Sequence, residues 1–187
     1  MSKGNIIVRE AMKANPSTVD PKTSVNKAAI LMRENGIGNC IVVSGTSDKP
    51  IGIITESDII KKVVAENIKA SEVSVEKIMS SPLLVIDPYA TLEEAMKTMG
   101  KCNIRRLPVI EKGILIGIIT HKDISRISPI LHEISREWYD ISKIDESYKK
   151  RQIFSGKCED CNTLSTNLKN IEGRLLCEDC IDALEYE

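Results

Sequence analysis

One short stretch occurs twice in the chain. Its copies run from Gly52 to Asp58 and from Gly117 to Asp123, and each has a glycine, two isoleucines, a threonine and then an aspartate three residues later. The apolar run is typical of a buried strand, and the polar residues after it are typical of a helix start. We therefore predict that each threonine and each aspartate lies where a strand ends and a helix begins.

Two interpretations of these residues are open. Backbone N–H groups and the helix dipole make a helix N-terminus a good anion site, so Thr55 with Asp58, and Thr120 with Asp123, could hold the ribose and phosphate of a nucleotide. Thr-x-x-Asp before a helix is also close to a capping box, which only satisfies the first backbone donors of that helix. The repetition at matched places favours the binding interpretation.

The repeat extends well beyond this stretch. With an offset of 67 residues, Met12 matches Met79 and Asp20 matches Asp87, and the offset becomes 65 at the glycine stretch. In each copy, apolar positions at helical spacing are followed by two strand-like runs. The sequence therefore predicts an α/β (α+β) fold made of two β-α-β-β-α units, with a period too long for a solenoid.

In its motifs this region resembles the CBS domain family in its usual tandem pair, the Bateman module, of the archaeal type. The matching features are Met12 with Pro16, Met79 with Pro82, the segment Arg105–Val109, and both Gly-Ile-Ile-Thr-x-x-Asp stretches. The resemblance implies two CBS domains, at 5–68 and 72–130, packed sheet to sheet. It also implies a cleft that takes adenine nucleotides (AMP, ADP or ATP), and a sensor rather than an enzyme, with no catalytic residues.

The two halves of that cleft are expected to differ. By the resemblance, residues entering the second strand of a unit approach the nucleotide phosphates, and in the second unit these are Arg105 and Arg106. Arginine matches phosphate oxygens bidentately, whereas the aligned positions of the first unit carry no charge. Lys122 follows the second threonine and attracts anions, but Glu56 follows the first and repels them. We predict a better site in the second unit, with the nucleotide-binding residues Arg105, Arg106, Thr120, Lys122, Asp123, Thr55 and Asp58.

The tail carries two CxxC pairs separated by 15 residues, Cys158 with Cys161 and Cys177 with Cys180. This spacing is a strong zinc signal. Four thiolates complete a tetrahedron and leave no open position for a catalytic water, so the site is predicted to be structural. Iron in a rubredoxin-like site is the alternative metal. The segment 155–187 resembles zinc ribbon or treble-clef modules.

A long amphipathic helix is predicted between these parts, at 131–154. Its apolar stripe contains Ile134, Trp138 and Ile141 at helical spacing. An aromatic residue in such a stripe is typical of an interface anchor. We expect a packed connector that also contributes to a homodimer.

Composition narrows the remaining choices. The net charge of −1 gives no general attraction to nucleic acid or membrane, and an aromatic content of 3% is too low for base-stacking surfaces. No apolar run reaches the roughly 20 residues that span a bilayer, and no secretory signal is visible, so we expect a cytoplasmic protein. The favoured function is a nucleotide sensor with a protein partner. The alternatives are a protein or nucleic-acid adaptor acting through the zinc segment, and an iron electron-transfer site.

Overall fold

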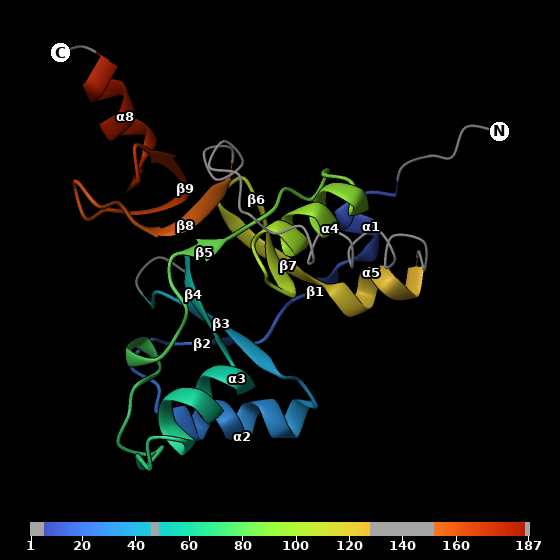
Figure 1. Ribbon diagram of the computed structural model, residues 1–187, viewed down its shortest axis with the longest axis vertical. Coiled ribbons are helices and arrows are strands. Elements are labelled where there is room, and N and C mark those ends of the chain that lie inside the picture. Colours follow the sequence, from blue (N-terminus) through green and yellow to red (C-terminus); the bar gives the residue numbers. More distant parts are fainter. Residues whose placement is uncertain (1–5, 46–48, 128–151, 186–187) are drawn as a thin grey trace.

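The computed structural model describes residues 6–45, 49–127 and 152–185 of the 187-residue chain (Figure 1). These residues form two α/β units, followed by a small tail of three strands and one helix. Each unit carries its own sheet, and the tail sheet incorporates one short strand of the second unit. The predicted duplicated α/β fold is confirmed.

The first unit has the order that the sequence predicts. Its elements are β2 (Thr18–Val19), α2 (Val25–Asn35), β3 (Asn39–Val43), β4 (Pro50–Thr55), α3 (Glu56–Ile59) and the π-helical turn η1 (Ile60–Val64). Strand β3 lies between β2, to which it is parallel, and β4, to which it is antiparallel. Helix α2 begins at Ser24, whose hydroxyl accepts from Lys27 N, and it ends at Gly36 in the left-handed conformation.

The second unit repeats this plan from its first helix onward, but the counterpart of β2 is reduced to a parallel bridge between Ile86 and Val109. Its elements are β5 (Leu83–Leu84), α4 (Leu92–Lys101), β6 (Arg106–Glu111), β7 (Ile114–Thr120) and α5 (His121–Ile127). A capping box of Thr91 and Glu94 begins α4. Between the units lies an apolar cluster to which both contribute, built from Ile41, Leu83, Val85, Ile110 and Ile118. The sheets of the two units therefore share an apolar interface.

The core of each unit includes the segment that precedes the other unit in the chain. Helix α1 (Val8–Ala11) places Val8 in the core of the second unit, and β1 (Lys13–Ala14) pairs with β7. In the same way, the 3-10 turn η2 (Val75–Lys77) places Val75 in the core of the first unit. Ser80 then forms a bridge with Ile53 of β4. Neither core is complete without the partner unit's leading segment.

The two repeated glycines explain how this exchange fits. A Cβ atom on Gly52 would lie 2.6 Å from Sδ of Met79 and 3.0 Å from the carbonyl oxygen of Ser80. A Cβ atom on Gly117 would meet the matching atoms of Met12 and Lys13. Glycine is therefore required at both places because another backbone crosses the strand there.

The tail is attached to the second unit by a shared sheet. Its elements are β8 (Ile153–Lys157), β9 (Leu164–Ile171), β10 (Arg174–Leu176) and α8 (Glu178–Glu185), and the sheet order is β10-β9-β8-β5. Strand β8 pairs with β5 through Leu83 with Ser155 and Leu84 with Phe154. The tail is thus joined to the CBS-like region through backbone hydrogen bonds.

The predicted helix at 131–154 is contradicted at its end. Residues 153 and 154 belong to strand β8, because their backbone groups pair with β5 and β9. The rest of the prediction lies outside the described residues, and so does the homodimer contact that it was expected to supply. None of the described helices combines the length and the apolar character that crossing a membrane requires.

The crossing at Gly52 yields a stability prediction. Gly52→Ala is expected to lower the free energy of unfolding by about 1–3 kcal/mol, because the added methyl group meets backbone as well as Met79. The matched control is Gly45→Ala. Among the described residues other than its chain neighbours, a Cβ atom there would meet only an oxygen of the exposed Asp20 carboxylate. The control should change stability by less than about 0.5 kcal/mol. Urea denaturation measures the free energy of unfolding of both variants. Equal losses in Gly52→Ala and Gly45→Ala would contradict the close backbone crossing at Gly52.

Candidate functional site

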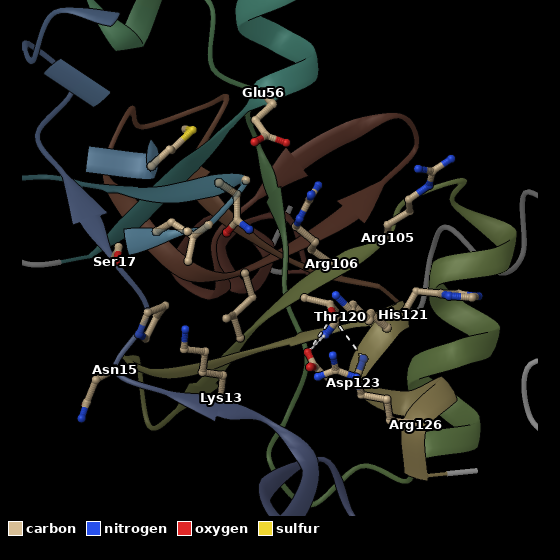
Figure 2. A pocket seen from close by; sticks show the side chains of 18 of the residues that line it. Lys13, Asn15, Ser17, Glu56, Arg105, Arg106, Thr120, His121, Asp123 and Arg126 are labelled. Carbon is tan, nitrogen blue, oxygen red and sulfur yellow. Dashed lines mark hydrogen bonds between the residues drawn. The ribbon is translucent and has the colours of Figure 1, made fainter. Parts of the chain in front are cut away.

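A cavity of about 1220 Å³ lies between the two units (Figure 2). The first unit and its leading segment contribute the turn at Asn15–Ser17, the approach to β3 at 37–39, and Glu56. The second unit contributes the start of β6 and the junction of β7 with α5, at residues 120–123. The cavity therefore forms only where both units meet.

The side chains that line the cavity carry far more positive charge than the chain as a whole. Six basic side chains line it, against the two carboxylates of Glu56 and Asp123, whereas the whole chain carries a net charge of −1. The basic residues are Lys13, Arg33, Arg105, Arg106, Lys122 and Arg126. Charges of one sign gathered in a cleft attract the opposite ion. This arrangement suits an anionic ligand.

In the lining of the cavity, Thr120 and Asp123 form a capping box. Oδ2 of Asp123 accepts from the backbone N of Thr120 at 3.0 Å and from its hydroxyl at 2.6 Å, and the Asp123 N donates back to that hydroxyl at 3.3 Å (Figure 2). Within the described part of the chain, the other carboxylate oxygen of Asp123 has no hydrogen-bond partner. One half of the carboxylate caps the helix, and the other half is open to a ligand.

The matching pair in the first unit has the same cap but a different surrounding. Oδ2 of Asp58 accepts from the backbone N and hydroxyl of Thr55, at 3.0 and 2.6 Å. Its Oδ1 accepts from Lys62 at 3.0 Å and from Ser80 at 3.4 Å. Burial raises the pKa of Asp58, but the hydrogen bonds from Thr55 and Lys62 outweigh burial and hold it below its ordinary value. Thr55 and Asp58 do not line the cavity.

The two predicted arginines both reach the cavity, in different environments. Arg105 is exposed, whereas Arg106 is half-buried beside the first unit. A Cβ atom on Gly38 would lie 2.7 Å from a carboxylate oxygen of Glu56 and 3.5 Å from Nη2 of Arg106. Burial lowers the pKa of Arg106, and the charge of Glu56 opposes that shift. Glu56, which was expected to act on the first cleft, thus lines the same cavity as the arginines.

Sequence reasoning missed three of the basic residues. Lys13 arrives on β1, which crosses over from the leading segment, and Arg33 comes from helix α2 of the first unit. Their positions depend on how the units pack, so no local pattern identifies them. Arg126 could have been found, since a residue three positions after Asp123 lies on the same face of α5.

The four tail cysteines come together as predicted from their spacing. Their sulfur atoms all lie within 4.8 Å of one another, with Cys158 to Cys180 at 3.8 Å and Cys161 to Cys177 at 3.6 Å. A tetrahedral ion with metal–sulfur bonds of about 2.3 Å requires sulfur–sulfur separations of about 3.8 Å. All four are free thiols. The cluster therefore has the dimensions of a four-thiolate metal site.

Backbone groups of the tail prepare one of these sulfurs for a metal. The N–H of Cys177 donates to Sγ of Cys158 at 3.3 Å. Burial raises the pKa of Cys158, but backbone hydrogen bonds from Cys161, Cys177 and Asp160 outweigh it and lower the pKa to about 6. The thiolate is the form that binds metals. By contrast, burial raises the pKa of Cys40 to about 11, as suits a core thiol.

Comparison with known proteins identifies the class of this fold. The CBS domain family matches residues 8–65 and 75–129, and the chain belongs to that family. The resemblance in the sequence motifs is thereby confirmed. An uncharacterised protein of Methanopyrus kandleri is 34% identical over 190 residues, which cover 95% of this chain and 92% of that protein. The likeness includes the tail as well as the two CBS domains.

Solved structures agree with this assignment. The CBS domain pair of protein MJ0100, in complex with 5′-methylthioadenosine and S-adenosyl-L-methionine, is 28% identical with a TM-score of 0.60, and the match covers 66% of this chain and 95% of that one. A CBS domain protein from Pyrobaculum aerophilum complexed with AMP has a TM-score of 0.63 at 23% identity. The match covers 70% of this chain and 99% of that one. The second likeness concerns the fold alone.

The two aspartates yield a prediction about stability. Asp58→Ala and Asp123→Ala each remove a helix cap, which should lower the free energy of unfolding by about 1 kcal/mol. Asp58→Ala also removes the hydrogen bonds from Lys62 and Ser80. We therefore expect Asp58→Ala to lower the free energy of unfolding by about 1 kcal/mol more than Asp123→Ala does, as measured by urea denaturation at pH 7.

The difference between these variants should depend on pH. The folded-state pKa of Asp58 lies below its ordinary value of 3.8, so its extra contribution is present above that value and is lost as the pH falls through the folded-state pKa. Equal destabilisation by the two variants at pH 7 would contradict the contacts described for Asp58.

Proposed function

We propose that the protein is a regulatory sensor that binds an adenine nucleotide of the AMP class in the cavity between its CBS domains. The observation that carries this proposal is the open carboxylate oxygen of Asp123 in the lining of a basic cavity. A ribose needs an acceptor for its hydroxyl groups, and a phosphate needs cations and N–H donors. The cavity offers both within one space.

The five predicted residues that line the cavity then each have a role, whereas Thr55 and Asp58 lie outside it. Asp123 accepts from the ribose hydroxyls, and Thr120 holds the carboxylate in place through its two hydrogen bonds. Lys122, Arg105 and Arg106 attract the phosphate. Ile37 and Ile118 supply apolar surface for the adenine ring. The adenosine-based ligands of the MJ0100 domain pair support this choice of ligand.

Zinc is the metal that we propose for the four cysteines. Thiolates in a tetrahedron suit zinc, and the closed ligand set gives it a structural role. The sulfur separations of 3.6 and 3.8 Å support the fit. Bound zinc would hold the loop after β8 against the start of α8. Small segments of this kind fold only with their metal.

We propose that the tail relays a change in the cavity. The hydroxyl of Ser155 donates to the carbonyl oxygen of Pro50, and Nζ of Lys49 donates to that of Leu164 at 3.1 Å. Strand β4 runs from this contact at Pro50 to Thr55, directly before Glu56 in the cavity. A shift of the first unit around a ligand would therefore move the tail, where we propose that a partner protein binds. Free thiols suit the reducing cytoplasm.

Nucleotide titration by calorimetry tests the site. Replacing both Arg105 and Arg106 with alanine should weaken AMP binding at least about tenfold, since one charge-assisted hydrogen bond is worth about 1.5–3 kcal/mol. The matched control is Arg9→Ala, which removes an arginine that pairs with Glu111 outside the cavity. Unchanged AMP affinity in the double variant would overturn the proposed role of the arginines.

Metal analysis of the purified protein tests the tail. We expect one zinc per chain, which Cys180→Ser should lose and Cys102→Ser, in a half-buried cysteine outside the cluster, should keep. Removing zinc with a chelator should also change the AMP affinity of the wild type if the tail is coupled to the cavity. Iron in place of zinc would instead favour an electron-transfer role, and retention of metal by Cys180→Ser would contradict the four-cysteine site.

A further inference from the structure

The two units carry the same Thr-x-x-Asp cap, yet only Asp123 lines the cavity, with one oxygen that accepts no hydrogen bond from the described residues. The capping distances are nearly identical, with the threonine hydroxyl 2.6 Å from the carboxylate in both units. The difference therefore does not lie in the motif. It lies in what surrounds the second carboxylate oxygen.

In the first unit that oxygen is held by Lys62. Its Nζ lies 3.0 Å from Oδ1 of Asp58, one helical turn away, and 2.6 Å from the carbonyl oxygen of Ile78. The side chain of Asp58 is only 12% exposed, whereas that of Lys62 is 45% exposed. The lysine thus covers the carboxylate from the solvent side, and the Ile78 carbonyl fixes it there.

The second unit has no lysine at the matching place. Counting 65 residues on from Lys62 gives Ile127, which is 43% exposed and has no side-chain donor. Oδ1 of Asp58 accepts a hydrogen bond from Lys62, whereas Oδ1 of Asp123 remains available to a ligand. The ammonium group of Lys62 takes the position that a ribose hydroxyl would take if the first unit bound a nucleotide as the second unit is proposed to do.

We propose that Lys62 sets the nucleotide stoichiometry of this CBS pair: it occupies the acceptor of the first unit and leaves the second unit as the single adenine nucleotide site. This inference rests on the proposed function. A nucleotide at Asp58 would have to displace an ion pair and a second hydrogen bond, which the ligand at Asp123 does not have to do. Lys62 is the charged donor to Oδ1 of Asp58 and Ser80 is the more distant, uncharged one, so removing the lysine should make most of the acceptor available.

Calorimetric titration with AMP measures the stoichiometry directly. The wild type is expected to bind one AMP per chain. Lys62→Ile is expected to bind a second AMP, more weakly than the first because Gly38 and Asn39 stand where the second unit has Arg105 and Arg106. The reciprocal variant Ile127→Lys places a donor four residues after Asp123, and it should weaken AMP binding at least tenfold. The matched control is Lys61→Ala, which removes an exposed neighbouring lysine with no hydrogen bond to Asp58, and it should bind one AMP with wild-type affinity.

The outcomes separate the two proposals. A wild type that binds no AMP overturns the nucleotide-sensor function, and with it the role of Lys62. A wild type that binds two AMP molecules keeps that function but overturns the inference. One AMP in the wild type, together with unchanged binding in Ile127→Lys, also overturns it. Ile127→Lys alters an exposed position, so it decides the question even if Lys62→Ile fails to fold.

Discussion

The exchange of leading segments is the constraint on which the rest of this structure depends. Val8 completes the core of the second unit and Val75 completes that of the first, so neither unit can bury its apolar surface alone. The crossing backbones pass directly over Gly52 and Gly117. The segment that crosses Gly117 also contains Lys13, which lines the cavity between the units.

The duplicated scaffold is symmetric, but its chemistry is not. Both units form the same cap with the threonine hydroxyl at the same distance. They differ in the neighbour of the aspartate, Lys62 against Ile127, and in Arg105 and Arg106, which the second unit contributes to the cavity. In physical terms, an internal ammonium group competes with a ligand hydroxyl for one carboxylate oxygen. A tandem fold can in this way keep two structurally equivalent positions while presenting one of them to a ligand.

Much of this arrangement could be predicted from the sequence, and the limits have a physical origin. The repeat, the caps and the cysteine cluster depend on short spacings, so Thr120 with Asp123 and the four tail cysteines come together as the sequence predicts. Contacts between segments far apart in the chain could not be predicted. The pairing of β8 with β5, which replaces the end of the predicted helix, depends on packing of that kind, as does the position of Arg33 in the cavity.

The most direct test of the central claim is a crystal structure of the protein grown with AMP and zinc. We expect AMP in the cavity with its ribose hydroxyls on Asp123 and its phosphate near Arg105 and Arg106. We also expect one zinc ion on the four tail cysteines, and Lys62 still bonded to Asp58. A nucleotide bound against Asp58, or one bound away from the cavity between the units, would contradict this claim.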